Sequence, residues 1–189
     1  PFPPTVHVEL TNECNLECPM CARTTSMIRP VQHMPDDMFR RVVDDLQDQG
    51  VEKVFLHHFG ESLMHPHAYE LIKYAARKKR VGRVSLSTNV TTLNKKNARR
   101  LIKTNLHHLT LSVDADSRDV YKVVRGFDFD RMLDNARGFL QQHRDYESKM
   151  HVTVLIINMG IKRHEIEDFK RTWQPYVSSR VKILVKRMS

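Results

Sequence analysis

The chain has 189 residues, of which 40% are hydrophobic and 28% are charged, and this composition is typical of one globular domain with a single core. No apolar run approaches the roughly 18 residues of a membrane-spanning helix, and no signal peptide opens the sequence. The chain has only three cysteines, all in one short segment, which indicates a reducing cytosol, so we expect a cytoplasmic protein. The formal charge of +9 lies mostly on expected helix ends and faces without interleaved aromatic residues. It therefore argues against a single-strand nucleic-acid binder and favours solvated surface charge, while an acidic partner stays open.

Strand and helix patterns alternate through the first half of the chain. A strand is expected over residues 5–11, because Val6, Val8 and Leu10 recur with period two. This strand leads into a cysteine-containing segment and a loop that extends to His33. The elements expected next are a helix from about 35 to 49 that ends at Gly50, a strand over 51–59, a helix from about 66 to 79, a strand over 83–89 and a short helix capped by Asn94.

The same alternation continues through the second half and indicates the fold class. Six strands separated by helices predict a parallel sheet with right-handed crossovers. Such a sheet is either doubly wound or part of a barrel, and a cysteine segment stands where the doubly wound form would have its Gly-rich loop. The expected elements are a strand over 108–114, helices over 116–124 and 129–143 that break at Gly126, a strand over 151–157, a helix over 165–173 and a strand over 181–185.

All three cysteines lie within eight positions, as Cys14, Cys18 and Cys21, in the spacing C-x3-C-x2-C. Three thiols are an odd number for disulfides, which would also need an oxidising compartment, and they are one ligand short of a closed zinc site. A zinc site completed by one of the eleven histidines stays open on this pattern alone. The set also suits an iron–sulfur cube held at three corners, whose fourth iron can bind a small molecule.

Polar residues with binding potential follow the expected strands. In barrel folds the chemistry lies in the loops after the carboxyl ends of the strands, so these residues are candidates for one site. Each pair taken alone also fits an ordinary turn. The candidates are Gly60 and Glu61 after the second strand, Ser87 and Asn89 at the end of the third, and Ser112 and Asp114 at the end of the fourth.

The cysteine triplet and these strand-end residues, taken in order, resemble the radical S-adenosylmethionine (SAM) superfamily. The resemblance implies a partial (β/α)6 TIM-like barrel of parallel strands. It also implies that Cys14, Cys18 and Cys21 hold a [4Fe-4S] cluster, whose free iron binds the amino and carboxylate groups of SAM. Such enzymes cleave SAM reductively to a 5′-deoxyadenosyl radical, which abstracts a hydrogen atom from the substrate.

The resemblance assigns SAM-binding roles to two of the strand ends. Gly60 and Glu61 resemble the family's Gly-Gly-Glu motif, in which a backbone edge and a carboxylate engage the SAM ammonium group. The chain departs from that motif because Phe59 replaces the first glycine. Ser112-Val-Asp114, followed by an Arg-Gly, resembles a Ser-Leu-Asp subgroup in which the serine and the arginine contact the SAM carboxylate and ribose. We assign the arginine to Arg125, with Arg131 as the other candidate.

Two further positions follow from the same resemblance. Ser87 and Asn89 match a Thr-Asn-Gly of the SAM region, with Val90 in place of the glycine. Leu155 or Ile156 in the fifth strand corresponds to the hydrophobic ledge that packs against adenine, and ordinary core packing is the alternative for either residue.

The sequence is most similar to the SPASM-type subgroup, whose members often carry a C-terminal cysteine-rich extension with auxiliary clusters. We therefore interpret residues 1–189 as one radical SAM core domain that is truncated at its C-terminal end. The expected substrate is a peptide or small natural product, and a dehydrogenase or epimerase acting on a carbohydrate or nucleoside-like molecule is the alternative. A flavodoxin- or ferredoxin-type protein is the expected electron donor. The substrate itself, the outcome after hydrogen abstraction, the fate of SAM, any catalytic acid or base and the oligomeric state stay open.

The rival interpretation from a different class is a non-catalytic module that binds zinc through the cysteines and RNA through its basic surface. Such a module would be colourless and indifferent to SAM. Its RNA binding would weaken steeply with salt, because each neutralised phosphate releases a counterion.

Overall fold

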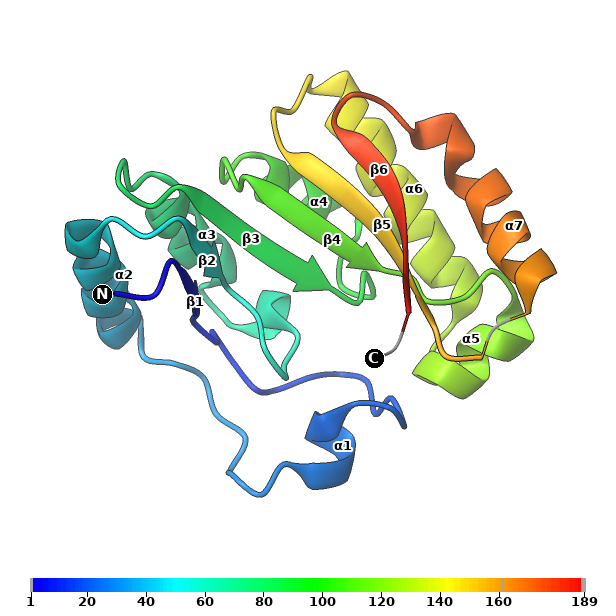
Figure 1. Ribbon diagram of the computed structural model, residues 1–189, viewed down its shortest axis with the longest axis horizontal. Coiled ribbons are helices and arrows are strands. Elements are labelled where there is room, and N and C mark those ends of the chain that lie inside the picture. The colour runs from blue at the N-terminus through cyan, green and yellow to red at the C-terminus, as the bar shows by residue number, and fades with distance from the viewer. Residues whose placement is uncertain (1, 161, 188–189) are drawn as a thin grey trace.

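The computed structural model describes residues 2–160 and 162–187, and its centre is one sheet of six parallel strands (Figure 1). The strands lie side by side in chain order, so β1 and β6 form the two edges. A doubly wound sheet reverses its strand order at a switch point, and this sheet does not. The expected partial barrel of parallel strands is therefore confirmed. The strands are β1 Thr5–His7, β2 Lys53–Phe55, β3 Arg83–Thr88, β4 His108–Ser112, β5 His151–Asn158 and β6 Val181–Arg187.

Helices connect successive strands, and the longer ones cover one face of the sheet (Figure 1). The expected end signals act locally: Asn94 Oδ1 accepts the N–H of Asn97 at 3.0 Å, and Gly50 and Gly126 take left-handed φ values of 74° and 66° at helix ends. Among the helices of the described ranges, none has the length and apolar character to cross a bilayer. The helices are α1 Ala22–Ser26, α2 Asp36–Gln49, α3 Ala68–Ala76, α4 Lys95–Ile102, α5 Arg118–Arg125, α6 Phe129–Asp145 and α7 Arg163–Trp173, with 3-10 turns at Ser62–Met64 and Gln174–Tyr176.

The two faces of the sheet differ in chemistry. Successive side chains of a strand point to opposite faces, and residues aligned across parallel strands share a face. The face toward the helices is apolar and buried in the core, with Leu86, Leu109 and Val152 in one row and Val54 beside Val84 in another. The opposite face, here called the inner face, carries the aligned row Phe55, Ser85, His108 and His151.

The first strand is shorter than expected, because the chain leaves the sheet to hold the cysteine segment. Ladder pairing of β1 with β2 ends at His7, although the N–H of Val8 still donates to Phe55 O at 2.8 Å. Farther on, Leu10 O accepts the N–H of Met34 at 2.8 Å and Thr11 bridges to His33. Residues 8–11 are thus extended backbone that pairs with the far end of the cysteine loop.

One other expectation is corrected, and one helix shows which of its apolar residues enter the core. The loop expected from Cys21 to His33 contains helix α1, whose first turn forms as Cys21 O accepts the N–H groups of Thr24 and Thr25 at 2.9 and 3.1 Å. In α2, Met38 is 44% exposed, and Phe39 is buried in its place. The apolar residues of this helix offer two possible buried stripes that are offset by one residue, one through Met38 and one through Phe39. The stripe with the aromatic Phe39 packs into the core.

Candidate cluster and cofactor site

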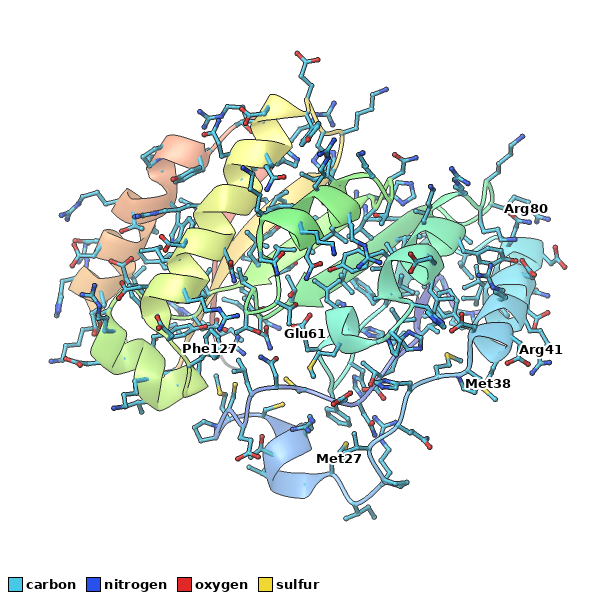
Figure 2. All side chains as sticks on the ribbon, turned by 180° about the vertical axis from the view of Figure 1, so that it is seen from behind. Met27, Met38, Arg41, Glu61, Arg80 and Phe127 are labelled. Atoms are coloured by element: carbon cyan, nitrogen blue, oxygen red, sulfur yellow. The ribbon has the colours of Figure 1, made fainter. Side chains whose placement is uncertain are left out.

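The three cysteines lie on the segment between β1 and α1, which runs past the carboxyl ends of the strands (Figure 1). Their thiols are free; Cys18 is buried, and Cys14 and Cys21 are half-buried. All three line one cavity of about 300 Å³. In Figure 2, Glu61 lies between the sheet and the loop that carries α1. The residues at or after strand ends that line the same cavity are Gly60, Glu61, Ser87, Thr88, Asn89, Ser112 and Ile157, and Arg125 at the end of α5 joins them.

Asn12 fixes the shape of the cysteine loop. Its side chain is buried; Nδ2 donates to Pro30 O at 2.8 Å, and Oδ1 accepts the N–H of Gln32 at 2.7 Å. The carbonyl of Asn12 also accepts a hydrogen bond from Arg23 Nε at 2.8 Å. These bonds join the residues before the first cysteine to those after the last, so the loop has a defined path around the thiols.

Gly60 lets the loop after β2 touch the cysteine segment. A Cβ atom at this position would lie 2.0 Å from Thr11 O and 2.7 Å from Glu13 O, so no larger residue fits without a backbone shift. The following N–H, of Glu61, donates to Glu13 O at 2.8 Å. The glycine is therefore required by close packing of two backbones, a reason that the motif alone does not reveal.

The carboxylate of Glu61 joins the loops after β2 and β3. It is buried, and its oxygens accept hydrogen bonds from Thr88 Oγ1 at 2.9 Å, from the N–H of Asn89 at 2.7 Å and from the N–H of Leu63 at 3.3 Å. Burial raises the pKa of Glu61, and these bonds, with a smaller contribution from Arg125, oppose the rise. A cationic ligand in the cavity would favour the ionised form in the same way.

Asn89 connects this network to the cysteines. Its Nδ2 donates to Asn15 Oδ1 at 3.1 Å and points at Cys14 Sγ at 3.7 Å. The next residue, Val90, has a φ of 71°, a left-handed value that strains a β-branched side chain. The Thr-Asn-Gly motif that this segment resembles has a glycine at this position. Val90 therefore adopts the left-handed backbone conformation that favours glycine.

Arg125 and Asp114 form a buried ion pair beside the cysteines. Asp114 is fully buried, with a left-handed φ of 61°, and its Oδ1 accepts the N–H of Ile157 at 2.8 Å while Oδ2 pairs with Arg125 Nη2. Arg125 Nη1 also points at Cys18 Sγ at 3.5 Å. Burial opposes the charge of Arg125, but Asp114 and Cys18 outweigh it and raise the pKa of the guanidinium. This arginine is therefore a fixed cation.

Two serines and a histidine complete the wall of the cavity. Ser87 Oγ and Ser112 Oγ share a hydrogen bond of 3.0 Å across β3 and β4. The N–H of Ser87 donates to Nδ1 of His57 at 3.1 Å, so this ring must be unprotonated at Nδ1. Burial, with a smaller effect of nearby histidines, lowers the pKa of His57 to about 4. His57 is consequently neutral at pH 7.

The structure brings together most of the expected site residues. The three cysteines and six of the SAM-binding candidates line the cavity. Asp114 and Leu155 do not line it, and Asp114 contacts two of its lining residues, Arg125 and Ile157. Ile157, two residues farther along the same face of β5, lines the cavity. Sequence reasoning did not select Thr88 or His57 as site residues, because strand-end hydroxyls and histidines are common and only their contacts distinguish these two.

The donor set fits an iron–sulfur cluster. The three thiols supply sulfur ligands, and the N–H groups of Asn89 and Arg125 are directed at two of the sulfurs, where they would stabilise ligated thiolates. Burial raises the pKa of the Cys14 thiol, so ligation would release a proton there. Within residues 2–160 and 162–187, no three His, Cys, Asp or Glu side chains surround a point as ligands of one metal ion do. A cube of four irons takes its ligands at separate corners.

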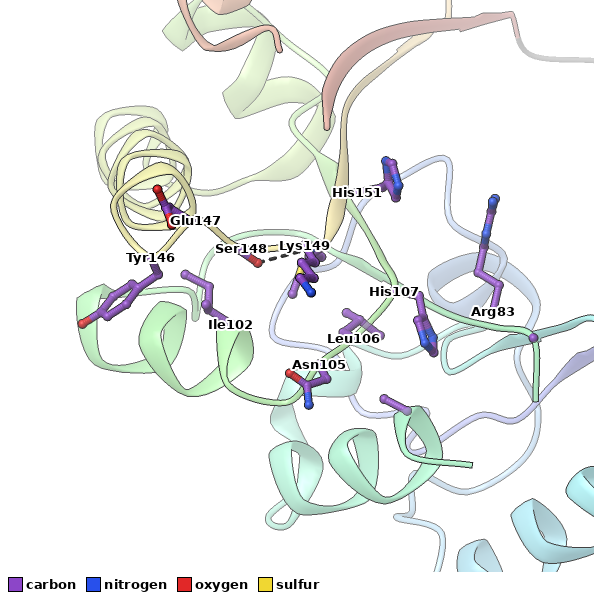
Figure 3. A pocket seen from close by; sticks show the side chains of 13 residues that line it. Arg83, Ile102, Asn105, Leu106, His107, Tyr146, Glu147, Ser148, Lys149 and His151 are labelled. Atoms are coloured by element: carbon purple, nitrogen blue, oxygen red, sulfur yellow. Dashed lines mark hydrogen bonds between the residues drawn. The ribbon is translucent and has the colours of Figure 1, made fainter. Parts of the chain in front are cut away.

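A larger cavity, of about 720 Å³, opens at the amino ends of β3 to β5, far from the thiols in sequence and in the fold (Figure 3). Arg83, His107 and His151 line it, and one wall is closed by a bond from the N–H of Met150 to Ser148 Oγ at 3.3 Å. No cysteine is among its lining residues in the described part of the chain. Size alone therefore does not mark the cofactor site.

The sequence profile of the radical SAM superfamily matches residues 8–172, which include the cysteines and the lining of their cavity. The chain therefore belongs to the radical SAM superfamily. Membership of this superfamily implies a [4Fe-4S] cluster and SAM as cofactors. Family membership favours the enzyme over the zinc- or RNA-binding module.

Two curated relatives show the breadth of this family. The antilisterial bacteriocin subtilosin biosynthesis protein AlbA of Bacillus subtilis is 31% identical over 129 residues, which are 66% of this chain and 28% of that protein. The probable GTP 3′,8-cyclase of Pyrococcus abyssi is 30% identical over 168 residues, which are 88% of this chain and 51% of that protein. The chain thus spans about half or less of the length of these relatives.

Solved structures show the same fold. SuiB of Streptococcus suis bound to SAM matches with a TM-score of 0.79 at 17% identity, over 100% of this chain and 42% of that one. SuiB bound to its precursor peptide SuiA matches with a TM-score of 0.78 over 97% of this chain and 39% of that one. Both likenesses show the partial barrel.

Proposed function

We propose that this chain holds its [4Fe-4S] cluster through Cys14, Cys18 and Cys21 and acts on a peptide or small natural-product substrate. The observation that carries the proposal is the convergence of the three thiols with Glu61 and Arg125 on one cavity. When bound and reduced, the cluster supplies the electron that splits SAM, and the resulting 5′-deoxyadenosyl radical abstracts a hydrogen atom from the substrate.

The two charged groups of the cavity suit the two charged groups of a methionyl moiety. We assign the ammonium group to Glu61 and the Gly60 backbone edge, where a buried carboxylate would gain a cationic partner. We assign the carboxylate to Arg125 and Ser112. The Nε atom of Arg125 is buried and has no hydrogen-bond partner among the described residues, so a carboxylate ligand would satisfy a donor that the chain leaves unpaired.

The remaining assignments follow the walls of the cavity. Ser87 and Asn89 are the polar groups that could bind the ribose hydroxyls. Ile157 is the apolar residue of β5 at the cavity, and we assign it the adenine contact in place of Leu155. Asp114 acts as a positioning residue, because it holds Arg125 through the buried ion pair.

A Glu61→Gln substitution tests the ammonium assignment. It removes one negative charge and presents an amide N–H₂ to the N–H and O–H donors that surround this side chain. The dissociation constant of SAM from the reconstituted protein, measured by anaerobic equilibrium dialysis, should rise by about tenfold or more. Glu70→Gln, at an exposed ion pair with Arg100, is the matched control. Equal SAM affinity for Glu61→Gln and the control would contradict the assignment.

Similarity to peptide-related proteins supports a peptide substrate. AlbA is named for bacteriocin biosynthesis, and SuiB is bound to a precursor peptide in one structure. The similarity to a probable GTP cyclase keeps a nucleoside-like substrate as the second candidate. The test is the rate of 5′-deoxyadenosine formation with precursor-like peptides or with GTP, and deuterium transfer from the labelled compound into 5′-deoxyadenosine. Acceleration and transfer with GTP alone would overturn the peptide proposal.

We assign electron delivery to a flavodoxin- or ferredoxin-type protein. Such donors are acidic, and the formal charge of +9 on this chain would steer them toward it. Reduction by either donor should slow as ionic strength rises, because salt screens the attraction.

A further inference from the structure

The inner face of the sheet has an unusual charge pattern. None of the six described strands contains an Asp or a Glu residue, yet their basic residues nearly all point to the inner face. A closed barrel fills this face with branched apolar side chains. The inner-face residues that carry or can carry positive charge are His7, Lys53, Arg83, His108, His151, Lys182 and Lys186.

His108 lies at the middle of this array. Its Nε2 shares a hydrogen bond of 2.8 Å with Thr153 Oγ1, and Thr153 is aligned with Lys182 on β6. Burial, with smaller effects of Arg83, Lys182 and His151, lowers the pKa of His108 to about 4, and His108 in turn helps to lower the pKa of His57. Every charged or titratable neighbour that acts on this ring is therefore basic. A ligand with negative charge would relieve that repulsion.

A buried donor next to His108 has no partner. Ser85 is aligned with His108 on the inner face and is 1% exposed, and its Oγ has no hydrogen bond among the described residues. Leaving a buried hydroxyl unpaired is costly, so the site offers an unused hydrogen-bond donor within a basic surrounding.

The array is extended along the strands. Lys182 and Lys186 are exposed on β6 and lie four residues apart, or about 13 Å at the usual rise of a strand. Arg83 and His151 continue the basic surface to the amino end of the sheet, where Figure 3 shows both side chains. A single small anion cannot contact all of these groups, whereas an extended chain with several carboxylates can.

We propose that the inner face binds an acidic segment of the substrate peptide, with its carboxylates against Lys182, Lys186 and His108. This inference rests on the proposed peptide substrate and adds the chemical class of the segment that is recognised. In this arrangement Ser85 donates a hydrogen bond at the centre of the surface, and the repulsion between like charges disfavours cationic peptides, since the described strands carry no carboxylate.

The direct test is the binding of fluorescein-labelled hexaglutamate to the chain, measured by fluorescence anisotropy without SAM or reductant. We expect hexaglutamate to bind and hexaglutamine not to bind, with an affinity that falls as salt rises. The double variant Lys182→Gln/Lys186→Gln should bind about tenfold more weakly, since each partly exposed ion pair contributes modestly. Lys170→Gln on the outer surface of α7 is the control and should bind as the unchanged chain does.

A second readout locates the peptide at His108. With saturating hexaglutamate, the pKa of the His108 imidazole, followed by NMR, should rise from about 4 because nearby carboxylates favour the imidazolium. Equal binding by the double variant and the unchanged chain, no binding by the unchanged chain, or an unmoved His108 titration would overturn the inference. Tighter binding of pyrophosphate or GTP than of hexaglutamate would overturn the peptide class. None of these outcomes depends on SAM cleavage, so failure here is distinguishable from failure of the proposed enzyme activity.

Discussion

Asp114 and Arg125 form an ion pair in which the carboxylate is fully buried and the guanidinium is 13% exposed. The pair joins the loop after β4 to the last residue of α5, and Arg125 also points at Cys18 Sγ. The arginine is thereby held beside the cluster ligands before any cofactor binds. Its orientation is a property of the fold, and this property leads to the first prediction.

Asp114→Asn should destabilise the chain strongly. The substitution leaves the Arg125 charge buried without a counterion, and removing one partner of a buried pair costs about 3–5 kcal/mol. The free energy of unfolding in urea measures the effect. Asp130→Asn, which breaks an exposed ion pair with Arg118, is the control and should change stability little. Similar losses for both variants would show that the buried pair has no special role.

Gly60→Ala should disrupt the contact between the loop after β2 and the cysteine segment. The added Cβ would overlap Thr11 O, so we expect a loss of at least about 1–3 kcal/mol in urea unfolding and a lower iron content after reconstitution. Gly138→Ala is the control: it lies within α6 with no atom within 4 Å of its Cβ, and it should stabilise the helix by about 0.5–1 kcal/mol. A fully loaded, equally stable Gly60→Ala protein would contradict the packing argument.

His57 should make stability depend on pH. Its pKa is about 4 in the folded chain and 6.5 when unperturbed, so the unfolded chain binds more protons between these values. The stabilisation is complete above pH 6.5 and is lost as pH falls toward 4, by at most about 3 kcal/mol. Urea unfolding from pH 7 to pH 4.5 should show a shallower decline in His57→Gln. The same decline in His57→Gln as in the exposed-site control His164→Gln would contradict it.

The sequence was sufficient for much of the fold. Period-two and helical spacing predicted all six strands, and their alternation with helices predicted that the strands are parallel. Gly50 and Gly126 were expected at helix ends, and both adopt left-handed φ values there. The early end of β1 was missed because it depends on bonds to a segment more than 20 residues away, as between Leu10 and Met34. The short helix α1 was missed because its five residues bury no side chain and so show no apolar periodicity.

The candidate site was predictable where residue type and strand end coincide. The three cysteines, Glu61 and Arg125 were expected there and share one cavity. Leu155 does not line the cavity, whereas Ile157 on the same face of β5 does, because alternation gives the face of a strand but not the depth at which a cavity meets it. The role of Asp114 in holding Arg125 depends on its left-handed backbone, which residue order does not reveal.

The central claim is that Cys14, Cys18 and Cys21 hold a cluster that cleaves SAM. The most direct measurement is anaerobic: the chain is reconstituted with iron and sulfide, reduced with dithionite and mixed with SAM, and 5′-deoxyadenosine is assayed beside the EPR spectrum. The account predicts a reduced-cluster signal that changes when SAM is added, with 5′-deoxyadenosine formed by the unchanged chain. Each Cys→Ala variant should show neither, while it keeps its circular dichroism spectrum. A cluster signal indifferent to SAM, or full SAM cleavage by any one of these variants, would contradict the account.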